Sequence, residues 1–80
     1  MPIHTMHSPL PGTFYRKPSP DAPTFKEIGE KVSEGEVIGL IEVMKTFTRI
    51  TAEVAGTIVV FHVDDEDAVM AGQPLVDIET

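Results

Sequence analysis

The feature that most constrains the fold of this chain is a weak internal repeat. Residues 32–42 and 69–79 share the pattern V-x-x-G-x-x-aliphatic-x-x-I-E, with corresponding positions 37 apart. Earlier in each half, residues 10–14 match residues 54–58 at a separation of 44. Because 44 exceeds 37 by seven, the first half carries seven extra residues between positions 15 and 32. Two copies are too few for a solenoid, and they predict two matched half-sheets related by a pseudo-twofold axis.

The aliphatic composition indicates that these half-sheets are built of strands alone. The chain has nine valines and seven isoleucines but only three leucines, and β-branched side chains favour pleated strands over helices. Proline, glycine and β-branched residues interrupt every potential helical stripe. We therefore predict an all-β flattened barrel or sandwich. The expected strands are residues 3–7, 12–15, 25–28, 36–43, 46–52, 56–63, 67–70 and 74–79.

Between two of these strands, Met44-Lys45 breaks a local rule of turn chemistry. A two-residue hairpin loop needs positive φ at its centre, so Asn-Gly or Asp-Gly is expected there. Neither Met44 nor Lys45 is such a residue. Local rules tend to be broken at functional sites. We predict that Lys45, at the exposed tip of this hairpin, is a handle for covalent modification.

Length, charge and cysteine content limit the possible classes of function. Eighty residues make a single domain over 1–80, and the net charge of −7 disfavours binding to nucleic acid or anionic membranes. The chain has no cysteine, which excludes disulfides and thiol chemistry. It has neither an apolar run of membrane-spanning length nor a signal-peptide pattern, so a cytoplasmic location is expected.

The seven surplus residues fall in a proline-rich segment at about 17–24, which we call the thumb. Three prolines within residues 18–23 cannot form a central strand or a helix. A stiff, extended protrusion follows. Composition alone fits a tolerated surface loop. Its presence in only one half of a symmetric scaffold indicates a lid or a clamp.

Metal binding and catalysis find little support in the sequence. His4 and His7 are predicted on opposite faces of one strand, and no cysteine or tight carboxylate cluster joins them with His62. The acidic run at 64–67 lacks the glycine and glutamate of a calcium loop. No Ser/His/Asp or Cys/His arrangement can be defended, so we expect a chain that is not itself an enzyme.

Three motifs, in this order, carry a resemblance that covers almost the whole chain. They are S-P-L-P-G-T-F-Y-R at 8–16, P-S-P-D-A at 18–22 and E-V-M-K at 42–45. Together they resemble the biotin carboxyl carrier domains of the bacterial acetyl-CoA carboxylase type. The resemblance implies two four-stranded antiparallel sheets with quasi-twofold symmetry, the biotinyl/lipoyl-like fold. It also implies that the proline-rich segment lies beside the biotin as a thumb.

The family likeness implies a cofactor and three protein partners. Biotin would be attached to Lys45 by a biotin protein ligase, and would carry CO2 from a biotin carboxylase subunit to a carboxyltransferase subunit. Acidic residues near the hairpin, Glu42 and Glu53, are expected to guide docking onto basic partner surfaces. The residues expected at the cofactor site are Glu42, Val43, Met44, Lys45 and, from the thumb, Pro18, Ser19, Pro20, Asp21 and Ala22.

The turn at 64–67 departs from the family pattern. Glu66 stands where a turn glycine is usual and opposite Gly29 in the repeat, so we expect Asp64 or Asp65 to take the strained turn position instead.

Two alternative functions remain open. A lipoyl carrier of 2-oxo-acid dehydrogenase or glycine-cleavage type would have nearly the same fold, but Met44 and the thumb favour biotin. The other alternative is an unmodified β-barrel interaction module in which Lys45 is incidental.

Overall fold

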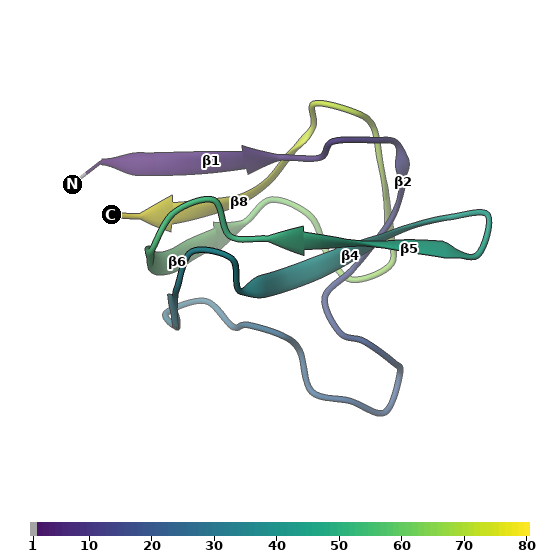
Figure 1. Cartoon of the computed structure of the whole chain (residues 1–80), viewed down its shortest axis with the longest axis horizontal. Helices are drawn as coiled ribbons and strands as arrows, with labels where there is room; N and C mark the ends of the chain where they lie inside the picture. Colours follow the sequence, from purple (N-terminus) through teal and green to yellow (C-terminus); the bar gives the residue numbers. More distant parts are fainter. Residues whose placement is uncertain (1) are drawn as a thin grey trace.

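The computed structural model describes residues 2–80, which form eight strands in two antiparallel sheets (Figure 1). The strands are β1 (Ile3–His7), β2 (Gly12–Tyr15), β3 (Lys31–Val32), β4 (Val37–Val43), β5 (Thr46–Thr51), β6 (Gly56–Phe61), β7 (Asp67–Val69) and β8 (Pro74–Glu79). One sheet has the order β1-β8-β6-β3 and the other the order β5-β4-β2-β7. The predicted all-β sandwich of two four-stranded sheets is confirmed.

The two sheets are related by the symmetry that the repeat predicts. Exchanging β1–β4 with β5–β8 converts the strand order of one sheet into that of the other. The turns repeat as well: the Gly35 N–H donates to the Ala52 carbonyl and the Gly72 N–H to the Ser8 carbonyl, both at 2.8 Å. Each sheet therefore contains two strands from each half of the chain, and neither half buries its apolar face alone.

The core lies between the sheets and is aliphatic apart from one phenylalanine. Its members are Met6, Phe14, Val32, Ile38, Ile41, Ile50, Ala52, Ile58, Val63, Val69, Leu75, Val76 and Ile78. Two glycines allow strands to approach closely at equivalent places. A Cβ atom at Gly12 would lie 2.6 Å from the Glu42 carbonyl oxygen, and one at Gly56 would lie 2.8 Å from Ile78 Cγ2. Both positions require glycine because any side chain would push the neighbouring strand away.

The third strand is not where the sequence placed it. We predicted residues 25–28, but β3 is the two-residue strand Lys31–Val32, which pairs with Thr57 and Gly56 of β6. Phe25 makes only one backbone bond at the base of the thumb, from its N–H to the Arg16 carbonyl at 2.8 Å. The prediction of this strand was wrong because so short a strand is defined by its partner rather than by its own residues.

The strands place the β4–β5 hairpin tip at one end of the molecule and both termini at the other (Figure 1). The chain leaves β2 and makes a long excursion before it returns at β3, and residues 17–24 lie in this excursion. Within residues 2–80, no helix is long and apolar enough to cross a membrane.

Candidate functional site

The hairpin between β4 and β5 ends in a tight turn made without glycine. Val43 pairs with Thr46, and the two residues between them, Met44 and Lys45, have φ angles of 50° and 68°. Positive φ at both central positions defines a type I′ turn, the geometry that matches the twist of the flanking strands. The rule-breaking turn expected from the sequence is therefore present. Each residue pays a conformational cost of about 1–2 kcal/mol for the left-handed region.

The side chains around this turn separate into an anchor and an exposed tip. Val43 is half-buried and packs against the core, whereas Met44 is 90 % exposed and Lys45 is exposed. The Lys45 backbone N–H donates to Glu42 Oε2 at 2.8 Å, so the carboxylate of Glu42 stabilises the turn. The rigid strands fix the Lys45 backbone, while its four-carbon side chain extends into solvent.

The thumb is closed at its base and tied to the body of the domain. The Phe25 N–H to Arg16 carbonyl bond closes the base, and the Ala22 N–H donates to the Ser19 carbonyl at 3.2 Å within the loop. Arg16 makes further contacts: its guanidinium lies 4.1 Å from the centre of the Phe61 ring, and one of its N–H groups donates to the Lys26 carbonyl at 3.1 Å. The protrusion is therefore held in place at both of its ends.

An ion pair also fixes the return of this excursion toward β3. The Lys26 ammonium lies 2.8 Å from the Glu36 carboxylate and donates to the Lys31 carbonyl at 3.1 Å. Its hydrogen bond to Glu36 raises the pKa of Lys26, and the same bond lowers the pKa of Glu36. The Glu36 carboxylate is exposed, although the Lys26 side chain is only 15 % exposed, so the pair orders the loop more than it stabilises the fold.

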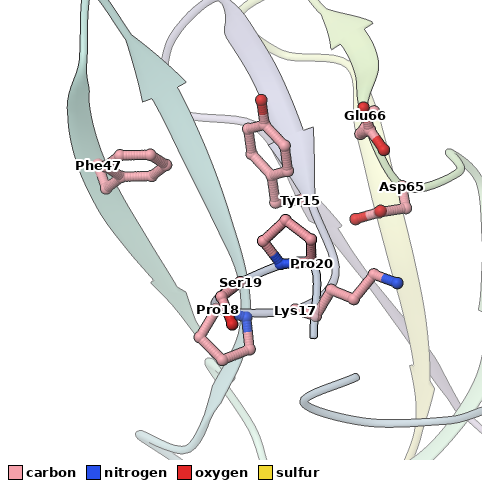
Figure 2. Close-up of a pocket in the computed structure, with 8 residues that line it drawn as sticks. All are labelled: Tyr15, Lys17, Pro18, Ser19, Pro20, Phe47, Asp65 and Glu66. Atoms are coloured by element: carbon pink, nitrogen blue, oxygen red, sulfur yellow. The ribbon is translucent and has the colours of Figure 1, made fainter. Parts of the chain in front are cut away.

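A pocket of about 360 Å³ lies between the thumb and the hairpin strand β5 (Figure 2). Tyr15 and Phe47 form one part of its wall, with ring centres 6.1 Å apart and planes tilted by 51°. Figure 2 shows the thumb residues at the base of the pocket and two carboxylates on the far side. The lining residues are Tyr15, Lys17, Pro18, Ser19, Pro20, Phe47, Asp65 and Glu66.

The turn that supplies the two carboxylates corrects one sequence prediction. We expected Asp64 or Asp65 in the strained conformation, but Glu66 has φ 70°, close to the 95° of its repeat partner Gly29. The reason lies in the backbone hydrogen bonds: the Glu66 N–H donates to the Phe14 carbonyl at 2.6 Å, as the Gly29 N–H does to the Ile58 carbonyl at 2.7 Å. The fold imposes this conformation at the third turn residue whatever its side chain.

The structure brings together only part of the predicted site. Pro18, Ser19 and Pro20 share a pocket with Phe47, which lies two residues beyond Lys45. The other thumb residues, Asp21 and Ala22, do not line this pocket. Sequence reasoning missed the remaining lining residues, Tyr15, Lys17, Phe47, Asp65 and Glu66. The signals available were two aromatic residues near strand ends: Tyr15 is the last residue of β2, just before the proline-rich segment, and Phe47 is the second residue of β5.

Two histidines outside this site lie beside carboxylates. His4 Nε2 lies 2.7 Å from Glu53 Oε1, and His62 Nε2 lies 2.9 Å from Asp77 Oδ1. No group of three or more metal-ligating side chains occurs among residues 2–80. Glu53 follows β5, in the connection to β6 at the end of the molecule that holds the termini (Figure 1). It is therefore not beside the hairpin tip as expected, whereas Glu42 is.

The fold and the tip together define a class of protein: a quasi-symmetric β-sandwich that displays one lysine on a rigid hairpin. Comparison with known sequences agrees. The biotin/lipoyl family, described as "Biotin-requiring enzyme", matches residues 4–78. The chain belongs to this family.

Three relatives illustrate the similarity. The chain is 42% identical over 76 residues to the biotin carboxyl carrier protein of acetyl-CoA carboxylase from Haemophilus influenzae, covering 95% of this chain and 49% of the relative. It is 40% identical over 72 residues to the protein of the same name from Pseudomonas aeruginosa, covering 90% and 46%. The chloroplastic protein of Glycine max is 43% identical over 70 residues, covering 88% and 27%. The chain thus spans half or less of the length of these relatives.

Proposed function

We propose that this chain is a biotin carboxyl carrier of the acetyl-CoA carboxylase type, with biotin joined to the Lys45 side-chain amine. The membership of the biotin/lipoyl family over residues 4–78 supports a carrier. The observation that supports Lys45 most is its place at the tip, in a strained turn held at φ 68° and braced by Glu42. Its side chain is exposed, as an acceptor for a ligase must be.

The residues around the tip fit a covalently attached biotin. The Lys45 amine can form an amide with the valerate carboxyl group of biotin, and this removes the positive charge of the lysine. The pocket beside β5 offers aromatic and proline surfaces for a flat ring, together with polar groups at its rim. Bound biotin supplies a ureido nitrogen that can carry CO2, which is chemistry that no side chain of this chain provides.

The chain itself contributes position and recognition rather than catalysis. The rigid β4–β5 hairpin fixes the attachment point, and the lysine side chain with its attached arm reaches the active sites of partners. Tethering raises the effective concentration of the group at each of those sites. We propose a biotin protein ligase, a biotin carboxylase and a carboxyltransferase as the partners, and Pro18, Ser19, Pro20, Asp21 and Ala22 as residues beside the arm. The cytoplasmic location stays a prediction.

The proposal is tested by mass spectrometry of the chain after incubation with a biotin protein ligase, biotin and ATP. We expect one biotinyl group on the wild type and on the control Lys31→Arg, which changes an exposed lysine in β3. Lys45→Arg should gain none, although it keeps the positive charge. Biotin on Lys45→Arg, or none on the wild type, would refute the attachment site.

The same measurement on protein from its native host decides between the alternatives. A mass shift matching a lipoyl group at Lys45 would establish a lipoyl carrier. An unmodified Lys45 in that material would support an interaction module.

A further inference from the structure

The pocket between the thumb and β5 carries a net negative charge that depends on one residue. Its charged lining consists of one cation, Lys17, and two carboxylates, Asp65 and Glu66 (Figure 2). With a neutral residue at position 66, the cation and the remaining carboxylate would balance. Glu66 therefore decides whether the net charge of the pocket lining is negative or zero.

The fold does not need a glutamate at this position. Glu66 has the positive φ that its repeat partner Gly29 adopts without steric cost, and the bond to the Phe14 carbonyl uses only the backbone. The side chain is exposed and makes no hydrogen bond that would account for it within the described chain. What the glutamate adds over a glycine is a carboxylate at the rim of the pocket.

The rest of the pocket selects the shape of its occupant. Tyr15, Phe47 and two of the three thumb prolines, Pro18 and Pro20, offer flat apolar surfaces, which suit a planar ring. Asp65 is fixed in place, since its Oδ1 accepts the Arg16 backbone N–H at 2.7 Å. The Glu66 carboxylate only accepts hydrogen bonds, so a ring that donates N–H groups is the complement.

We propose that Glu66 is a charge-selectivity residue, which makes this pocket hold a neutral, N–H-donating cyclic urea and reject the same ring once it bears a carboxylate. The inference rests on the proposed function, because the ring in question is the head group of biotin. The biotin arm without a carboxylate would rest against the thumb. The carboxylated arm, with one added negative charge, would be released for transfer.

The size of the effect follows from Coulomb's law. A second negative charge about 6 Å from Glu66 lowers occupancy about 3-fold in a dielectric like that of water, and about 10-fold at half that dielectric. Salt at about 1 M shortens the screening length to about 3 Å and should remove most of the difference.

The absence of cysteine from the sequence allows a direct test. Lys45→Cys gives a single thiol, to which three arms of equal length are attached: biotin, biotin with a carboxymethyl group on the ureido nitrogen, and the methyl ester of that compound. The ester and the acid differ by one negative charge and a single methyl group. Docking is measured in the full chain by NMR, as shifts of the Tyr15, Phe47 and Glu66 amides.

The expected result is that biotin and the ester shift these amides, whereas the acid does so about 3- to 10-fold less. Glu66→Gln should bring the acid and the ester within twofold of each other, and the matched control Glu34→Gln, in an exposed turn, should leave the ratio unchanged. Three results would overturn the proposal: equal docking of acid and ester when Glu66 is present, the same acid-to-ester docking ratio in Glu66→Gln, or no amide shifts with any arm. The thiol conjugates need no ligase, so these results are independent of whether a ligase biotinylates Lys45.

Discussion

Substituting Met44 by asparagine should stabilise the fold while slowing attachment of the cofactor. Met44 sits at φ 50°, where an ordinary side chain costs about 1–2 kcal/mol and asparagine costs less. The methionine is 90 % exposed, so its replacement loses only about a tenth of the stabilisation that full burial of the side chain would give. Full burial of such a side chain is worth about 1.5–3 kcal/mol, which makes this loss about 0.2–0.3 kcal/mol.

The balance is a gain of roughly 0.5–1 kcal/mol in the free energy of unfolding, and in a domain of this size this raises Tm by about 2–8 °C. Thermal unfolding followed by circular dichroism measures this change. Met70→Asn is the matched control, because Met70 is 68 % exposed and is absent from the positive-φ positions. It should give no increase in Tm.

We also expect slower biotinylation of Met44→Asn, because Met44 adjoins the proposed acceptor Lys45 and its exposed side chain is accessible to a ligase. Mass spectrometry over a time course with the ligase measures this rate. If Met44→Asn leaves Tm unchanged, or raises it no more than Met70→Asn does, the strain attributed to the turn does not exist.

Three further predictions concern stability. Gly56→Ala should cost about 1–3 kcal/mol in chemical unfolding, since its Cβ would collide with β8; wild-type stability would show that the close approach is not needed. Hydrogen bonds from His62 and Thr5 hold the pKa of Asp77 below its usual range, so its stabilising contribution is present above about pH 4 and is lost as the pH falls through the lowered pKa. In Asp77→Asn the drop in Tm between pH 5 and pH 2 should therefore be smaller than in the wild type, and an equal drop would contradict this. Glu66→Gly should raise Tm, because it relieves a left-handed residue without removing a core contact, whereas Glu66→Gln should not.

The sequence predicted the hairpin turn at Met44-Lys45 well because the signals there are local. Strand alternation brackets the turn at residues 44 and 45, and the two-residue loop length forces a type I′ geometry on whatever residues occupy it. The pocket beside it was only partly predicted. Its lining comes from β2, the thumb, β5 and the turn before β7, and no local pattern states that these four segments meet.

The strained turn before β7 shows how tertiary contacts override residue preference. Preference alone pointed to Asp64 or Asp65, which tolerate the left-handed region better than glutamate does. The hydrogen bond between the Glu66 N–H and the Phe14 carbonyl decided otherwise. The repeat held the better clue, because Gly29 occupies the equivalent position.

The amino-acid sequence by itself determined the all-β class, the twofold plan and the exposed lysine, since periodicity, duplication and turn length are properties of consecutive residues. Only the tertiary structure decided where β3 forms, which residue bears the strain at 64–67, and which charges surround the pocket. Those outcomes depend on hydrogen bonds and contacts between segments far apart in the chain, and such contacts exist only once the two sheets have closed on their shared core.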